Sequence, residues 1–113
     1  MAYDEELAER IRAVLGGQPG VTEKRMFGGL AFLVDAKMAV AASSHGALMV
    51  RVDPSRADEL VARPHVGHVA MRGRPMRGWL DVAPAALGTD DVLREWVDVG
   101  VGYARGLPAK ARR

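Results

Sequence analysis

The sequence predicts one two-layer α+β domain, in which helices pack on one face of an antiparallel sheet. Its 113 residues suit a single domain with one core. Helical spacing of apolar residues near both ends, and short apolar runs separated by turn residues between them, predict the order helix, four strands, helix, two strands, helix. The composition, 49% apolar and 27% charged, is that of a folded soluble domain and excludes a disordered or fibrous chain.

The first helix is predicted over residues 3–15. Leu7, Ile11, Val14 and Leu15 recur at helical spacing, with charged residues between them. Asp4 provides a capping side chain, and the glycines that follow residue 15 end the helix.

Four strands follow, predicted over residues 22–27, 30–34, 37–42 and 48–52. The first run is mostly polar, which indicates an edge strand, whereas the second is apolar on both faces, which indicates a more central one. Short turns join the runs, including a polar turn at 43–46. A meander is therefore expected.

The second half of the chain begins with Asp53-Pro54-Ser55, where a capping side chain precedes a proline and predicts a short helix. That helix is expected to end at Arg63-Pro64. Two strands are predicted over residues 69–72 and 78–82, joined by a connection at 73–76.

The last helix is predicted to start at Thr89, a capping residue, and to end before Pro108. Its spacing predicts a buried stripe made of Leu93, Trp96, Val97, Gly100 and Ala104. The basic tail, about residues 108–113, is expected to be a disordered end of the single domain 1–113.

The composition also limits the chemistry. The sequence has no cysteine, which excludes disulfides, thiolate metal sites and cysteine nucleophiles. It has neither a signal-peptide pattern nor an apolar run of about 18 residues, so no membrane contact is expected and a cytoplasmic location is the default.

One pair of residues has metal-like spacing. His65 and His68 are three residues apart, as are imidazoles that share an ion across one helical turn. Pro64 and Gly67 disfavour a helix at this point, so two incidental histidines in a surface loop are the preferred interpretation. No metal or cofactor is predicted.

The candidates for nucleophilic catalysis are Ser43, Ser44 and His45. They are adjacent in the sequence, whereas the members of a catalytic triad converge from separate parts of a fold. A polar hairpin tip is the simpler interpretation. No catalytic residue is predicted, and the protein is not expected to be an enzyme.

Gly28-Gly29 resembles part of a phosphate-binding loop, but the rest of that motif is missing. The pair precedes an apolar strand rather than a helix. We therefore interpret Gly28 and Gly29 as a structural turn or bulge that needs positive φ.

The basic stretch 71–79 is the most suggestive functional feature. Arg72, Arg74 and Arg77 could contact phosphates, and Trp79 could stack on a base. Arginines on a hairpin rim are, however, often only solubilising. Trp79 and Asp81 also alternate with Leu80 and Val82, so one of these two faces belongs to the core.

The sequence has six methionines, five of them spread over the strand regions. Most are expected to fill the core. If several emerged on one exposed face of the sheet, they would instead mark a surface for a partner or a second copy.

Arg25-Met-Phe-Gly-Gly29, the following run Leu30–Val34 and the later Met76-Arg-Gly-Trp-Leu80 resemble the N-terminal domain of the TfoX/Sxy family of competence regulators. The resemblance spans about residues 5–107. It implies a two-layer α+β fold with an antiparallel sheet and an association with regulation of DNA-uptake competence. The longer members carry a further C-terminal domain, so this chain resembles a stand-alone N-terminal domain.

These observations favour two functions. The first is a non-enzymatic regulatory domain that binds a protein partner or a second copy of itself. The alternative is a nucleic-acid-binding module that uses Arg72, Arg74, Arg77 and Trp79, for which DNA would be the partner.

Overall fold

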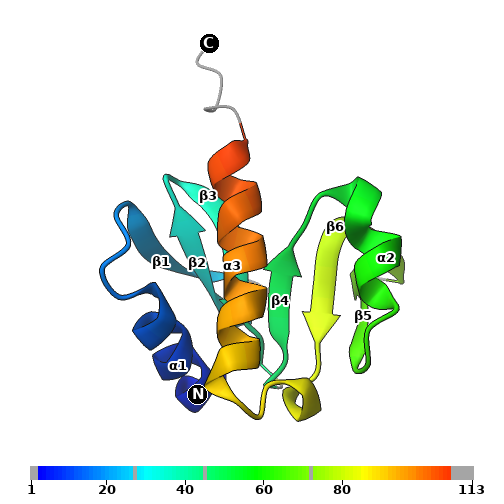
Figure 1. The fold of residues 1–113 in the computed structure, drawn as a ribbon, viewed down its shortest axis with the longest axis horizontal. Helices are drawn as coiled ribbons and strands as arrows, with labels where there is room; N and C mark the ends of the chain where they lie inside the picture. The colour runs from blue at the N-terminus through cyan, green and yellow to red at the C-terminus, as the bar shows by residue number, and fades with distance from the viewer. Residues whose placement is uncertain (1–2, 27, 45, 72, 108–113) are drawn as a thin grey trace.

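The computed structural model describes residues 3–26, 28–44, 46–71 and 73–107. The elements follow the predicted order (Figure 1). They are α1 (Glu5–Leu15), β1 (Val21–Met26), β2 (Gly29–Val34), β3 (Lys37–Ala42), β4 (Leu48–Arg51), α2 (Ala57–Val61), β5 (Val66–Met71), β6 (Arg74–Val82) and α3 (Asp90–Gly106), with single 3-10 turns at Pro54–Arg56 and Pro84–Ala86.

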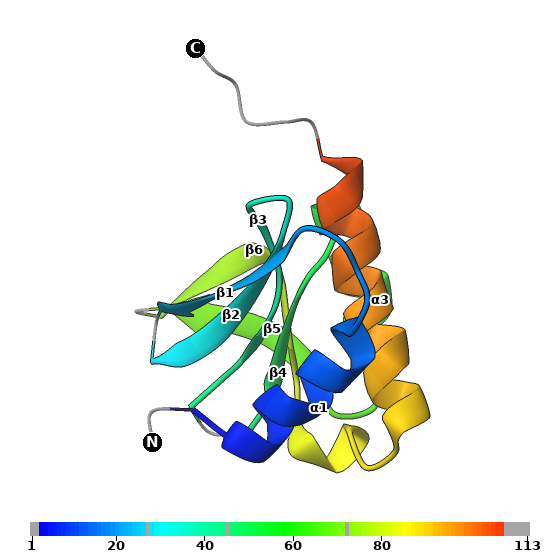
Figure 2. The ribbon, with the colours of Figure 1, turned by 90° about the vertical axis from the view of Figure 1, so that its left-hand side faces the viewer.

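The six strands form one open antiparallel sheet in the order β1-β2-β3-β4-β6-β5. The first four strands are a meander with β1 at one edge, as predicted. The chain then passes through α2 and reaches β5 at the far edge before β6 returns to pair with β4. The helices lie on one face of the sheet (Figures 1 and 2), which confirms the two-layer α+β prediction.

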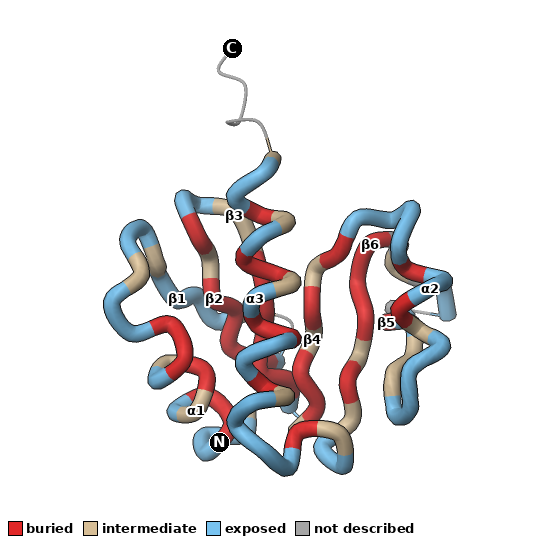
Figure 3. The backbone as a smooth tube through the Cα atoms, in the orientation of Figure 1, coloured by how far each residue is buried: buried red, intermediate tan, exposed pale blue. Residues whose placement is uncertain are grey.

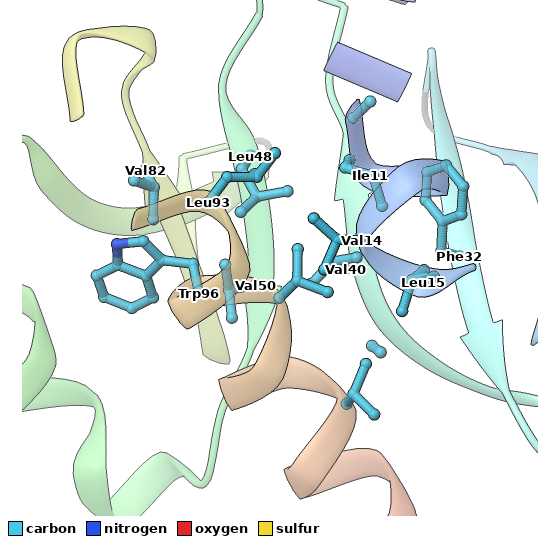
Figure 4. Close-up of a cluster of buried hydrophobic side chains, with 14 of the residues drawn as sticks. Ile11, Val14, Leu15, Phe32, Val40, Leu48, Val50, Val82, Leu93 and Trp96 are labelled. Carbon is cyan, nitrogen blue, oxygen red and sulfur yellow. The ribbon is translucent and has the colours of Figure 1, made fainter. Parts of the chain in front are cut away.

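The core fills the space between the sheet and its helices, and α3 runs across β3 and β4 (Figures 3 and 4). Leu93 and Trp96 of α3 pack there with Leu48 and Val50 of β4, and Ile11 of α1 lies nearby. The predicted α3 stripe is buried throughout. Burial of this apolar surface is the main stabilising contribution to the fold, at about 25 cal/mol per Å².

The two longer helices, α1 and α3, begin at the capping residues that the sequence predicts. The Asp4 carboxylate accepts a hydrogen bond from the Leu7 amide at 3.0 Å, and the Thr89 hydroxyl accepts one from the Val92 amide at 3.3 Å. Each satisfies a backbone donor that the first helical turn leaves without a partner.

The last two strands are longer than predicted. Residues 74–76 belong to β6 rather than to a connection, because Arg74 pairs with Met71 and Pro75 with Ala70. His68 lies in β5 and not in a loop. Pairing along the hairpin overrides the weak strand propensity of glycine and proline in this stretch. The register of the pair shifts between His68 and Ala70, so this hairpin is irregular.

Candidate functional site: the helix-free face of the sheet

The helices leave the second face of the sheet uncovered (Figure 2). Strand alternation decides which side chains reach it. In β4, Leu48 and Val50 are buried in the core, and the intervening Met49 and the following Arg51 are only partly buried. In β1, Glu23 bonds to Arg12 of α1 on the helical side, so Lys24 points to the helix-free side.

The helix-free face is concave and apolar at its centre. Figure 2 shows the β1–β2 hairpin and β6 projecting on this side of the molecule. A hollow of about 170 Å³ lies between them. We call it the Met hollow; it is lined by Met26, Gly29, Met38, Ala41, Ala42, Ser43, Met49, Met76 and Trp79.

A second, larger hollow of about 510 Å³ adjoins the first and shares Met26, Met38 and Trp79 with it. We call it the basic hollow; it is lined by Lys24, Met26, Leu33, Ala36, Lys37, Met38, Arg51, Trp79 and Leu107. Three of these side chains are cationic, and no acid is among its described lining residues. The two hollows therefore form one surface that is apolar at one end and basic at the other.

Contacts within the protein position two of the three cations. Arg51 Nη1 donates a hydrogen bond to the Met38 carbonyl oxygen at 3.4 Å, and its guanidinium lies 5.8 Å from the centroid of the Tyr103 ring. Lys37 Nζ donates to the carbonyl oxygen of Leu107 at 2.9 Å, at the C-terminal end of α3, where the helix dipole favours a cation. Lys24 is exposed, and no hydrogen bond or ion pair joins it to another described residue.

Trp79 is the link between the two hollows. It lies opposite Arg51 in the β4–β6 register and is only 9% exposed. Gly78 before it has φ of +85°, a conformation that favours glycine. Met76 and Trp79 line the same hollow although they are three residues apart, because β6 is irregular against β5 between Pro75 and Leu80, the stretch that contains both.

Of the predicted nucleic-acid contacts, the structure describes the side chains of Trp79 and Arg74. Trp79 is packed among methionines and exposes too little of its ring to stack on a base. Arg74 is exposed at the start of β6, and Arg77 lies further along the strand. Arg72 lies outside the described residues. Contact by these arginines stays a prediction.

The histidine pair has one notable contact, 3.9 Å between His68 Nε2 and Asp58 Oδ1, on the exposed surface between β5 and α2. His65 is exposed just before β5. Within the ranges that the structure describes, no three metal-binding side chains come together.

The polar turn between β3 and β4 is tied by a buried hydroxyl. Ser43 Oγ accepts a hydrogen bond from the Ala47 amide at 3.1 Å. Ser44 is exposed on the same turn, and His45 lies outside the described residues. Ser43 thus stabilises the turn beside the Met hollow.

Gly28 precedes β2 and Gly29 is its first residue; the predicted positive φ is found at Gly28 and not at Gly29. Gly28 has φ of +73° and nothing near the position of a side chain, whereas a Cβ on Gly29 would meet the Ala42 carbonyl oxygen. Gly29 therefore allows β2 to approach the end of β3 closely, at one edge of the Met hollow.

Sequence reasoning missed the three cations of the basic hollow. Lys24 and Arg51 could have been found from strand alternation, since each stands between residues that face the helices. Lys37 could not, because its place depends on where α3 ends. The expectation that most methionines fill the core was wrong: the described core contains none, and four methionines line one hollow on the helix-free face.

The chain matches the TfoX N-terminal domain model over residues 13–104, which is most of its length. It belongs to the TfoX N-terminal domain family. The match includes every described residue of both hollows except Leu107. Neither the curated proteins nor the solved structures gave a match to the chain. None of the helices in the described part of this TfoX N-terminal domain has the length and apolarity to cross a bilayer.

Proposed function

We propose that this TfoX N-terminal domain is a non-enzymatic interaction module that binds a protein partner through the helix-free face of its sheet. The observation that carries the proposal is the Met hollow, which Met26, Met38, Met49 and Met76 line together with Trp79 on the face that the described helices leave uncovered (Figure 2). Methionine side chains are flexible and polarisable and adapt to varied apolar surfaces, so they are frequent on binding surfaces.

The position of the methionines supports a binding role over a purely structural one. The opposite face of the sheet already carries a closed core beneath α1 and α3. Apolar surface left in water contributes nothing to folding, and uncovered apolar patches commonly mark interaction sites. The regulatory part of the proposal, a role in DNA-uptake competence, is drawn from family membership alone.

A nucleic-acid partner is the alternative, and the burial of Trp79 weighs against it. Single-stranded nucleic acids are held by exposed aromatic rings together with cations. The described cations of the basic hollow remain able to attract phosphate, so DNA is kept as an outcome of the experiment.

Photo-methionine in place of methionine tests the proposal in living cells. Irradiation should cross-link the chain to a protein through positions 26, 38, 49 and 76. A Met49→Glu variant that stays folded should lose these cross-links, because a charge would be buried in the contact. Met49→Leu also lacks photo-methionine at position 49; it is the matched control and should retain the cross-links from positions 26, 38 and 76.

Two results would contradict the proposal: cross-links from these positions to nucleic acid alone, or no cross-link from any of them. Cross-links to a second copy of the chain would make the partner a homodimer, which light scattering of the purified protein at rising concentration would check independently.

A further inference from the structure

We infer that the partner segment carries a bulky apolar side chain, which occupies the Met hollow, and neighbouring acidic side chains, which reach the basic hollow. This inference rests on the proposed function and adds the chemistry of the partner. Its basis is the adjacency of the two hollows, which share Met26, Met38 and Trp79.

The size of the Met hollow suits one large side chain. Its volume of about 170 Å³ is close to the roughly 150 Å³ of an apolar cavity that accepts a benzene ring. Leucine, phenylalanine or methionine would place its apolar atoms against the four methionines. A single anchor of this kind is typical of a peptide that docks in a pocket.

The positive charge of the basic hollow favours acidic residues next to the apolar anchor of such a segment. Lys24, Lys37 and Arg51 line it, and the only acid of β6, Asp81, is outside the lining of both hollows. Three like charges around one depression repel one another, and carboxylates brought between them would relieve that repulsion.

Two of these cations are held in place before any partner binds. Arg51 is fixed by the Met38 carbonyl and by the Tyr103 ring, and Lys37 by the end of α3. Less side-chain entropy is lost when such groups meet a carboxylate. Lys24, which is exposed, adds a cation that can adjust to the segment.

A nucleic acid would fit the basic hollow but not the Met hollow. Its phosphates would find the cations, but its bases would meet methionine side chains and the buried Trp79 rather than an exposed ring. A peptide with an apolar anchor and carboxylates uses both hollows at once.

The experiment titrates the full chain, labelled with ¹³C at the methionine methyl groups, with three short synthetic peptides. The first alternates leucine and phenylalanine with aspartate and glutamate, the second replaces the acids by lysine, and the third keeps the acids but replaces the apolar residues by serine. The first should bind and shift the methyl signals of Met26, Met38, Met49 and Met76. The second and third should bind at least about tenfold more weakly, the loss expected when one of two contacts is removed.

Lys24→Glu provides the test on the protein side, and Arg94→Glu, an exposed site on α3 across the sheet, is its charge-matched control. Lys24→Glu should weaken binding of the acidic peptide about tenfold, and Arg94→Glu less than about twofold, because surface charges more than a Debye length apart are screened. Higher salt should reduce the difference.

The outcomes separate this inference from the proposed function. Equal binding of the acidic and lysine peptides, with the same methyl shifts, would overturn the acidic preference and leave the protein-binding function standing. Binding of none of the peptides, with photo-methionine cross-links to a protein still formed, would do the same. An oligonucleotide that displaced the acidic peptide and shifted the same methyl groups would overturn the inference in favour of nucleic acid.

Discussion

The Arg12 guanidinium donates two hydrogen bonds to the Glu23 carboxylate, from Nε to Oε2 at 2.6 Å and from Nη2 to Oε1 at 2.9 Å. This bidentate pair ties α1 to β1, and Glu9 accepts a further bond from Arg12 Nη1 at 2.7 Å. Because neighbouring residues in a strand face opposite ways, the same contact directs Lys24 to the helix-free face.

The pair predicts a specific acid sensitivity. The hydrogen bonds from Arg12 hold the pKa of Glu23 below its ordinary value. A depressed folded-state pKa contributes stability that is present above the unfolded pKa and is lost as pH falls through the folded one. Wild type should therefore be more stable than Glu23→Gln at neutral pH, and the gap should close below about pH 4, near the ordinary glutamate pKa. Urea midpoints at the two pH values measure this; a gap independent of pH would contradict it.

The contact between α3 and β3 predicts a second effect. A Cβ on Gly100 would meet the Ala39 carbonyl oxygen and lie 2.8 Å from Val40 Cγ1, whereas nothing lies within 4 Å of one on Gly102. Gly100→Ala should cost about 1–3 kcal/mol by overpacking. Gly102→Ala, on the same helix, should stabilise by about 0.5–1 kcal/mol through helix propensity. Urea denaturation compares them, and equal effects would show that α3 can shift.

Ser43→Ala tests the buried hydroxyl of the β3–β4 turn. The substitution removes the acceptor of the Ala47 amide and should cost about 1–3 kcal/mol, since a buried donor is left without a partner. Ser55→Ala also removes a hydroxyl hydrogen bond, to Asp53, but on the exposed surface, and should cost less. Chemical denaturation of both variants would refute the idea if Ser55→Ala proved the more damaging.

Gly78→Ala tests the irregular strand that positions Trp79. Alanine at φ of +85° is strained, by about 1–2 kcal/mol for the left-handed region, and its Cβ would lie 3.2 Å from the Val52 carbonyl oxygen. Gly73→Ala is strained at φ of +77° but has open space. Thermal unfolding should show the larger loss for Gly78→Ala, and only that variant should shift the Met76 methyl signal. Similar losses of stability in the two variants would mean that the backbone at Val52 shifts without cost to accommodate the added Cβ.

Prediction of the local structure succeeded where short-range chemistry dominates. Asp4 and Thr89 cap helices because a capping side chain needs only the amides two or three residues ahead. The α3 stripe follows from helical periodicity alone. The extent of β5 and β6 was wrong because Arg74 and Pro75 are held by their partners in the hairpin, which local propensity does not describe.

The candidate site was predictable only in outline. The methionines were recognised as either core or partner surface. Strand alternation did not decide which face of the sheet carries Trp79. The structure decided it: Trp79 is buried and lines the Met hollow with Met76, so its ring is not free to stack on a base.

By itself, then, the sequence determined the two-layer class, the element order, both helix caps and the family resemblance, since these depend on periodicity and on contacts within a few residues. Only the tertiary structure decided that β6 pairs with β4, that the described helices leave one sheet face uncovered, and that Lys24, Lys37 and Arg51 line a hollow beside the methionine-lined one. The physical reason is that this surface is assembled across five strands and the end of α3. No local pattern encodes which side chains those long-range pairings bring together.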